Sequence, residues 1–259
     1  MADHGLRITR AIARCFDGRS EASLDPDLRV FVSDLVRPYG LPLREDLLRE
    51  GVGHSYEELA EGLVREALVD GESVDLLILA FDTPDVRPGA PSSLALSRSC
   101  PGTPLAFAVC DQGSAAAFTA LRLAADYHRT GACRRAVVVL AEQTALHYEP
   151  AGQVALPERH GVVVLVCEEA PGPTMAVHQI PGSEPPDVVL RMQAEQLGPD
   201  AALVLGPGLG GAEGPAAQPF TGVWAELAER LPAWQAQGRP VLVAGLDRRL
   251  GVLSMLTLA

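Results

Sequence analysis

The residue of this chain best placed for nucleophilic chemistry is a serine at the expected start of a helix. An apolar run, Pro104–Cys110, predicts a strand, and Gln112-Gly113 after it predicts a sharp turn. Ser114 then opens an Ala- and Leu-rich stretch of helical pattern. A nucleophile at a helix N-terminus lies beside backbone N–H groups and the positive end of the helix dipole. Because a hydroxyl is not ionised by that dipole as a thiol can be, Ser114 requires a general base within hydrogen-bond reach.

Each of these residues also has a purely structural interpretation. Serine is a favoured N-cap in any helix, so Ser114 can be a cap without catalytic duty. Cys110 lies near the end of a buried strand, where a free cysteine usually behaves as a small hydrophobe.

The elements that would position this serine follow an alternating order. Four continuous apolar runs predict strands buried on both faces, at Val74–Phe81, Pro104–Cys110, Arg135–Ala141 and Gly161–Cys167. One helical pattern, Ser55–Leu68, precedes the first of these runs, and another, Ser114–Arg129, lies between the second and the third. The fold class is therefore α/β.

A second, shorter cycle follows the Pro- and Gly-rich stretch Pro171–Pro186. It comprises a helix at Pro186–Gln196, a strand at Ala201–Leu205, a helix at Thr221–Gln235 and strands at Pro240–Gly245 and Gly251–Ala259. We therefore expect two unequal α/β halves, residues 1–175 and 176–259, that share one sheet system.

Composition removes several classes of function. The chain of 259 residues contains no Lys, which excludes a Schiff-base lysine, a P-loop and a kinase site. A formal charge of −12 disfavours binding to nucleic acid. The five Cys form no CxxC pair, and the first residues do not have the basic and apolar pattern of a leader, so we expect a cytoplasmic protein. Every apolar run is too short to span a membrane, so we expect no membrane segment. We expect no metal and no bound cofactor.

The stretch from Cys110 to Pro150 resembles the nucleophile segment of thiolase-superfamily condensing enzymes, in particular ketoacyl-ACP synthase III and type III polyketide synthases. The similarity extends over roughly residues 72–170, with Pro91-Ser92-Ser93 and Phe107 resembling the entry into the preceding strand. It implies a thiolase-like fold of two related halves with mixed, mostly parallel sheets, the second half being shortened.

The same resemblance implies roles for individual residues. Ser114 falls at the nucleophile position, Gln112 and Gly113 at the turn beside the oxyanion hole, and Tyr148 at the place of an aromatic gatekeeper. Thr144 and Cys110 are implied to lie at the pocket. Glu142 ends the next strand, and His147 is the histidine whose position suits a base acting on Ser114, although an ordinary loop histidine is the alternative. His160 is expected to have a structural turn role.

The chain also departs from the family pattern. The nucleophile position holds Ser in place of Cys, there is no Asn anywhere, and all six His precede residue 179. Where the family has a catalytic His, this chain has Gly206 and Pro207. Because each lost oxyanion donor costs about 2.7–4 kcal/mol of transition-state stabilisation, we do not expect decarboxylative condensation by this subunit alone.

Two further features have competing interpretations. The glycines of Gly206–Gly211 invite a dinucleotide-binding interpretation, but the spacing favours a tight strand-to-helix turn. The pairs Arg134-Arg135 and Arg248-Arg249 can meet phosphopantetheine or an acidic carrier protein, or can be solvated surface.

The sequence thus supports a ketosynthase-like partner subunit of polyketide- or fatty-acid-type biosynthesis, a pseudoenzyme of secondary metabolism. The resemblance implies a homodimer, or a heterodimer with a ketosynthase-like subunit, formed through PLAFAVC, with acyl carrier protein as a further partner. The alternative is a Ser114-dependent acyltransferase or thioester-cleaving enzyme with His147 as base. In both, the phosphopantetheine thioester of CoA or a carrier protein is the substrate. A third hypothesis is a small-molecule-binding α/β protein without acyl chemistry.

Overall fold

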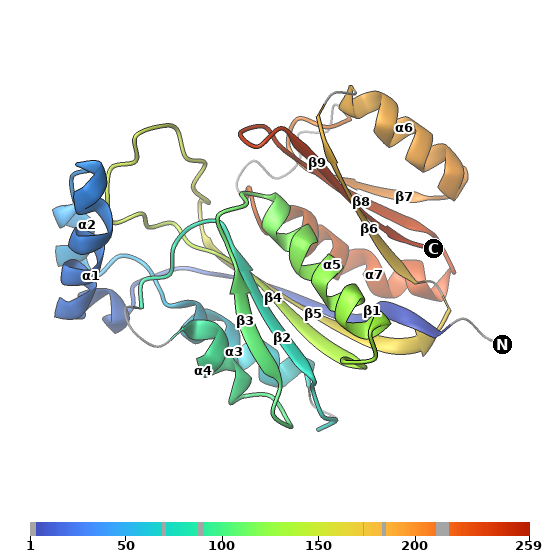
Figure 1. The fold of residues 1–259 in the computed structure, drawn as a ribbon, viewed down its shortest axis with the longest axis horizontal. Coiled ribbons are helices and arrows are strands. Elements are labelled where there is room, and N and C mark those ends of the chain that lie inside the picture. Colours follow the sequence, from blue (N-terminus) through green and yellow to red (C-terminus); the bar gives the residue numbers. More distant parts are fainter. Residues whose placement is uncertain (1–3, 69–70, 88–90, 173, 183–184, 211–217) are drawn as a thin grey trace.

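Two β-sheets enclose a layer of two helices (Figure 1). The computed structural model describes residues 4–68, 71–87, 91–172, 174–182, 185–210 and 218–259. Within these residues no helix is long and apolar enough to cross a membrane.

The first sheet has five strands in the order β1-β5-β4-β2-β3. They are β1 (His4–Phe16), β2 (Leu76–Phe81), β3 (Leu105–Val109), β4 (Arg135–Glu142) and β5 (His160–Pro171). β2 pairs in parallel with both β3 and β4, whereas β5 pairs antiparallel with β4 and β1. The carboxyl ends of β2, β3 and β4 therefore meet at one edge of the sheet.

The second sheet has four strands in the order β6-β9-β8-β7. They are β6 (Met175–Pro181), β7 (Ala202–Leu205), β8 (Val241–Asp247) and β9 (Val252–Leu258). β7 and β8 are parallel, and β9 is antiparallel to both of its neighbours. This order repeats that of the first sheet, with no described strand beyond β7 in the place that β3 takes beyond β2.

The long helices form layers around these sheets. α5 (Ala115–Arg129) and α7 (Gly222–Ala236) lie between the sheets, whereas α3 (Tyr56–Ala67) and α4 (Ser92–Ser97) cover the outer face of the first sheet and α6 (Pro186–Leu197) covers that of the second. α1 (Pro26–Val36), α2 (Glu45–Glu50) and the short 3₁₀ turns Glu21–Leu24 and Arg37–Tyr39 form a separate group at one side. α5 is thus enclosed by both sheets.

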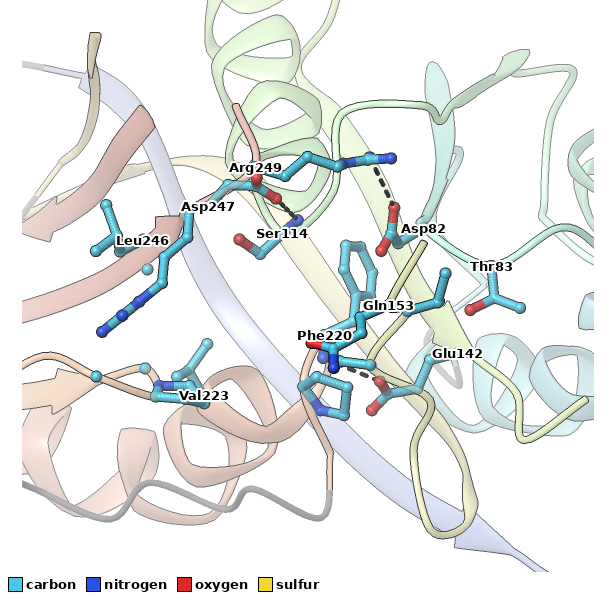
Figure 2. Close-up of a pocket in the computed structure, with 18 of the residues that line it drawn as sticks. Asp82, Thr83, Ser114, Glu142, Gln153, Phe220, Val223, Leu246, Asp247 and Arg249 are labelled. Carbon is cyan, nitrogen blue, oxygen red and sulfur yellow. Dashed lines mark hydrogen bonds and ion pairs between the residues drawn. The ribbon is translucent and has the colours of Figure 1, made fainter. Parts of the chain in front are cut away.

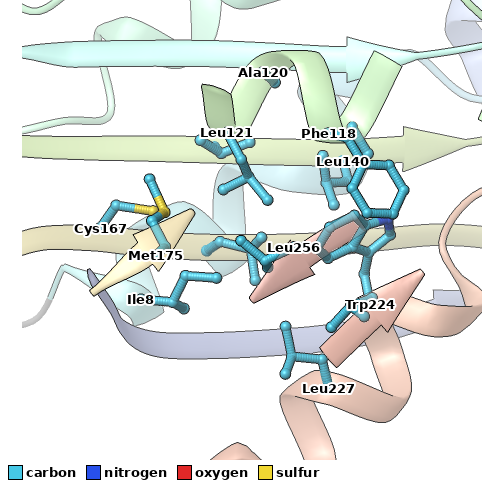
Figure 3. Packing of buried hydrophobic residues seen from close by; sticks show 14 of the residues in the cluster. Ile8, Phe118, Ala120, Leu121, Leu140, Cys167, Met175, Trp224, Leu227 and Leu256 are labelled. Atoms are coloured by element: carbon cyan, nitrogen blue, oxygen red, sulfur yellow. The ribbon is translucent and has the colours of Figure 1, made fainter. Parts of the chain in front are cut away.

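The largest core fills the space between the sheets (Figure 3). Phe118 of α5 packs against Trp224 of α7 with ring centroids 4.9 Å apart, and both side chains are fully buried. Gly245 of β8 approaches this pair so closely that a Cβ there would lie 3.1 Å from the Phe118 ring. Burial of these aromatic side chains joins the two halves of the chain.

Each of the predicted strands and helices is present, with ends shifted by a few residues. Ser55 and Glu58 form a reciprocal capping box at the start of α3. Gly206–Gly210 form a strand-ending turn, whereas Gly211 lies outside the described residues.

The sequence patterns did not predict the strands β1 and β6, and the expectation of mostly parallel sheets was wrong. β1 carries Arg7, Arg10 and Arg14 among its apolar residues and has an irregular register between Ile8 and Arg10, so its alternation is broken. β6 is an edge strand that is only partly buried. Because of these additions the sheets are mixed but not mostly parallel, with four antiparallel and three parallel pairings among the described strands.

We predict that Trp224→Ala lowers the free energy of unfolding by about 3–5 kcal/mol, because it leaves a large cavity between the sheets. Urea denaturation followed by circular dichroism measures this change. Tyr39→Ala, at an aromatic residue 76% exposed, is the control and is expected to change the value by less than about 0.5 kcal/mol. Equal effects of the two substitutions would contradict this account of the core.

Candidate functional site

A cavity of about 590 Å³ opens where the ends of the two sheets meet (Figure 2). Ser114 lies in its wall, together with carboxylates from both halves and the apolar side chains of Phe118, Phe220 and Trp224. Arg248 and Arg249, in the turn between β8 and β9, complete its rim. The volume is in the range of small-molecule sites.

The start of α5 is built by a sharp turn, as the sequence indicates. Asp111 has φ +61° and Gly113 φ +53°, and the amide of Ala115 donates to the carbonyl of Gln112 at 3.1 Å. Asp tolerates the left-handed region better than most residues, and glycine adopts it freely. Ser114 follows with helical dihedrals and its hydroxyl makes no capping hydrogen bond. The hydroxyl is therefore not engaged as a helix cap.

A carboxylate accepts a backbone N–H group at this turn. The Ser114 N–H donates to Asp247 Oδ2 at 3.0 Å. Asp247 Oδ1 accepts a second bond, from the Leu250 N–H at 2.8 Å. A Cβ on Gly113 would lie 1.8 Å from Asp247 Oδ2, so only glycine permits this contact. The end of β8 is thereby tied to the start of α5, and Asp82 after β2 lines the same cavity.

The negative charges at the turn influence one another. Burial raises the pKa of Asp82 above its ordinary value; Arg249, 3.9 Å away, opposes the rise, and the carboxylates of Asp247 and Asp111 add to it. The cavity wall beside Ser114 is consequently acidic.

The described residues contain no cluster of three or more His, Cys, Asp or Glu that could hold a metal ion.

Gln112, expected at the oxyanion turn, has its side chain in a polar network. Gln112 Oε1 accepts from the Thr119 hydroxyl at 2.6 Å, and Gln179 Nε2 of β6 donates to that hydroxyl oxygen at 3.0 Å. Gln179 also donates to the Ala115 carbonyl at 3.3 Å. These bonds fix the first turns of α5 on the second sheet.

Glu142, the last residue of β4, links this strand to the start of α7, a role that the sequence did not predict. Its fully buried carboxylate accepts from the amides of Phe220 at 2.9 Å and Thr221 at 3.0 Å, and from the Thr221 hydroxyl. Burial raises the pKa of Glu142, and these hydrogen bonds oppose the rise. Glu142 therefore joins the end of β4 to the start of α7 and fixes the floor of the cavity.

The other expected site residues lie in different places. Tyr148 lines the cavity, but Cys110, Thr144 and His147 are not among its lining residues. His147 is buried and its Nε2 lies 2.8 Å from the Val52 carbonyl oxygen, so this nitrogen carries the hydrogen. Burial lowers the pKa of His147. The structure brings together Ser114 and Tyr148 and directs His147 towards Val52.

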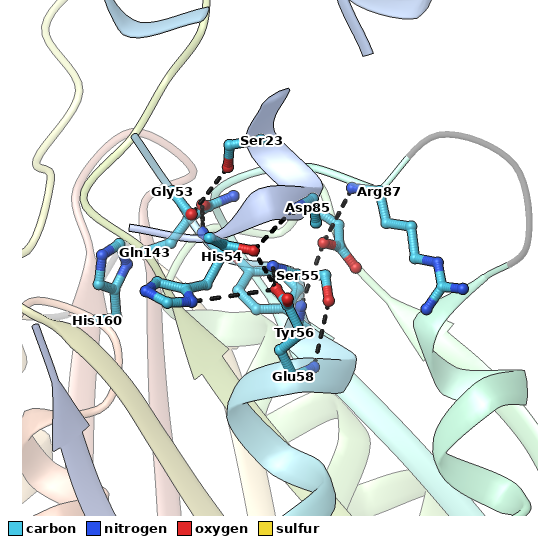
Figure 4. A network of polar contacts seen from close by, with 12 residues as sticks. Ser23, Gly53, His54, Ser55, Tyr56, Glu58, Asp85, Arg87, Gln143 and His160 are labelled. Carbon is cyan, nitrogen blue, oxygen red and sulfur yellow. Dashed lines mark hydrogen bonds and ion pairs between the residues drawn. The ribbon is translucent and has the colours of Figure 1, made fainter. Parts of the chain in front are cut away.

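His160 forms part of a second polar cluster, shown in Figure 4. Its ring stands edge-on to that of His54 with centroids 4.7 Å apart, and its Nδ1 accepts the Thr144 N–H at 3.4 Å. Gln143 Oε1 accepts the His54 N–H at 3.4 Å, and Gln143 Nε2 donates to the Pro84 carbonyl. The cluster ties the loop after β4 to the residues before α3 and after β2.

Comparison with solved structures identifies the architecture. 3-Oxoacyl-[acyl-carrier-protein] synthase III from Aquifex aeolicus VF5 superposes with a TM-score of 0.66 and 14% identity, over 98% of this chain and 99% of that one. A variant of OleA from Xanthomonas campestris gives 0.64 and 13% over 100% of both chains. AbyA1, described as a tetronic acid condensing enzyme, gives 0.61 and 20% over 97% and 99%.

The chain has the thiolase-like fold. The expected fold class is therefore confirmed, and the α5 turn lies between two related sheets as the resemblance implied. No family model and no curated protein matches the sequence.

Sequence reasoning missed Asp82 and Asp247 altogether. Each is an acidic residue that ends or directly follows a buried strand, which is the one signal that could have drawn attention to them. Asp82 follows a strand of the first sheet and Asp247 ends a strand of the second, so they line one cavity with Ser114 only once the two halves are packed together.

We predict a pH dependence that originates at His160. Burial and the neighbouring His54 lower the pKa of His160 from 6.5 to about 4, whereas Gly18 and Asp17 oppose the shift. The folded state thus favours the neutral imidazole, and the stability from this group is full above pH 6.5 and is lost as the pH falls towards 4. Urea unfolding at several pH values should show that His160→Gln has a smaller loss of stability between these limits than the unmodified protein. Identical profiles would show that His160 does not contribute.

Proposed function

We propose that this protein is a ketosynthase-like subunit of polyketide- or fatty-acid-type biosynthesis that does not itself perform decarboxylative condensation and acts as the partner of a ketosynthase-like subunit. The proposal depends chiefly on one observation: the Ser114 N–H group already donates to the carboxylate of Asp247.

The physical consequence concerns the oxyanion of an acyl-transfer intermediate. Such an oxyanion needs free N–H donors at the nucleophile. Here an anion of the protein already accepts the Ser114 N–H, and a second negative charge beside Asp247 would be repelled. The α5 start is therefore arranged as a stable, internally bonded structure and offers little stabilisation to a tetrahedral intermediate.

The residues available elsewhere support the same conclusion. The chain has no Asn, and the position implied for the catalytic His holds Gly206 and Pro207, which line the cavity. The donors that would stabilise an enolate oxygen are thus missing from the sequence. Solved structures that are similar to this chain carry names such as tetronic acid condensing enzyme and 3-oxoacyl-[acyl-carrier-protein] synthase III. This similarity supports a role beside such enzymes.

The partner would dock through β3, the strand that the resemblance implies. β3 is the edge of the first sheet and pairs only with β2 among the described strands. Leu105 on this edge is 52% exposed, and Leu94 on the adjacent α4 is 50% exposed. An exposed apolar edge strand is an available template for pairing with another chain.

A second candidate function, a Ser114-dependent acyltransferase or thioester-cleaving enzyme, is favoured by one observation. The Ser114 hydroxyl lies at the cavity and makes no capping bond. The expected base, His147, already bonds the Val52 carbonyl through Nε2, which leaves only Nδ1 for such a role.

Intact-protein mass spectrometry after incubation with acyl-CoA and acyl-carrier thioesters distinguishes the two functions. We expect no acyl mass on the unmodified protein or on Ser114→Ala, because the Ser114 N–H, a donor that the oxyanion needs, already donates to Asp247. An acyl group on the unmodified protein that is absent from Ser114→Ala would instead establish the acyltransferase.

Co-purification with a ketosynthase-like subunit that retains Cys, His and Asn tests the partner role. Leu105→Asp should abolish the complex because it places a charge on the β3 edge. Leu203→Asp, on β7 and 47% exposed, is the matched control and should leave the complex intact. Failure of the unmodified chain to form any complex would refute the proposal.

A further inference from the structure

One edge of the second sheet lacks the neighbour that its counterpart in the first sheet has. The orders β1-β5-β4-β2-β3 and β6-β9-β8-β7 correspond strand by strand, so β7 takes the place of β2. β2 is paired on both sides, by β4 and β3, whereas β7 pairs only with β8 among the described strands. The edges at β1 and β6 correspond to each other. The β7 edge is therefore where the described part of the second half is one strand short.

The backbone of β7 (Ala202–Leu205) is bonded on one side and open on the other. The N–H groups of Ala202 and Gly206 each donate at 2.8 Å to a carbonyl oxygen of the β8 segment. Because these groups alternate along a strand, the N–H and C=O groups of Leu203 and Leu205 point away from β8. They have no backbone partner among the described residues. Unpaired groups of this kind form a template for a second extended backbone.

A groove of about 400 Å³ lies beside this edge, at the flank of α6 (Figure 1). Its apolar lining includes Ala194, Ala201 and Leu203, and Leu203 is 47% exposed. The strand sequence Ala-Leu-Val-Leu contains none of the charged residues or prolines that usually protect a free edge. An added strand would therefore gain apolar burial as well as hydrogen bonds.

The charged side chains of the groove indicate which strand fits there. Arg191 and Glu195 lie one turn apart on α6, and both are exposed. Neither forms an ion pair with another residue in the described part of the chain. A twofold axis at the edge reverses the direction of α6, so Arg191 of one copy faces Glu195 of the other, and the reverse. The groove is thus complementary in charge to a second copy of itself.

We propose that the β7 edge is a self-association surface, at which two copies of this chain pair through antiparallel β7 strands and form one continuous sheet. Leu203 of one copy then lies opposite Leu205 of the other, and each such pair exchanges both of its N–H···O bonds. The two α6 helices lie on the same face of this sheet, with their Arg191 and Glu195 side chains facing one another.

This inference goes beyond the proposed function and does not depend on it. The ketosynthase-like subunit would dock on β3, which belongs to the first sheet, whereas β7 is the edge of the second. A dimer formed through β7 leaves both β3 edges free. Two copies would therefore join two such partner complexes into one larger assembly.

Sedimentation velocity of the full chain alone, over a series of concentrations, tests the surface. We expect a reversible equilibrium between monomer and dimer. Leu203→Asp should abolish the dimer, because it places a charge at the pairing edge. Leu105→Asp, the same change on the β3 edge, is the matched control and should leave the dimer unchanged. Circular dichroism of each variant verifies that it retains the fold.

Two charge reversals on the exposed face of α6 test the twofold arrangement. Arg191→Glu and Glu195→Arg should each raise the dissociation constant of the dimer about tenfold, because like charges then meet across the axis. An equimolar mixture of the two variants should recover the affinity of the unmodified protein, because every facing pair is then opposite in charge. A general loss of folding would not be repaired by mixing.

Several results would overturn the surface. These are a monomer at every concentration, a dimer that survives Leu203→Asp or is abolished by Leu105→Asp, and charge variants whose mixture associates no better than either alone. The partner role is decided separately, by co-purification with the ketosynthase-like subunit. A complex with that subunit but no β7 dimer refutes the surface alone, and a β7 dimer without that complex refutes the partner role alone.

Discussion

The hydrogen bond from the Ser114 N–H at the start of α5 to the carboxylate of Asp247 is the contact on which the organisation of this molecule depends. Ser114 follows β3 of the first sheet and Asp247 ends β8 of the second, so the two sheets are joined at the point where the helix begins. Carboxylates at a helix N-terminus accept hydrogen bonds from N–H groups that would otherwise be free, and their negative charge interacts favourably with the helix dipole. The arrangement is stabilising, and the same contact occupies the Ser114 N–H, a donor that an acyl oxyanion would require.

Stability and chemistry are therefore in competition at this turn. A condensing enzyme benefits from unsatisfied donors that are fixed by the surrounding fold and wait for the charge of the transition state. In this chain Asp247 is held by two amides, and Gly113 leaves exactly the space that its carboxylate fills. Glu142 completes the surrounding frame by binding the start of α7, which sets the cavity floor without presenting a free charge to it.

The cavity is present although the Ser114 N–H in its wall is already hydrogen-bonded to Asp247. Its walls combine aromatic side chains of α5 and α7 with the carboxylates of Asp82, Asp111 and Asp247 and the guanidinium groups of Arg248 and Arg249. The formal charge of −12 on the whole chain disfavours long-range attraction of an anionic ligand.

The sequence by itself determined the alternation of strands and helices, the sharp turn before Ser114 and the missing Asn, because buried strands, caps and turn residues leave local patterns. It did not reveal β1, whose arginines interrupt the apolar alternation, or the antiparallel pairings that β1 and β6 bring. Only the tertiary structure decided which side chains meet Ser114. Asp247 lies 133 residues further along the chain, and His147, which is much nearer in sequence, turns to Val52. Contacts between strand ends of different sheets depend on how the halves pack, and no local periodicity records that packing.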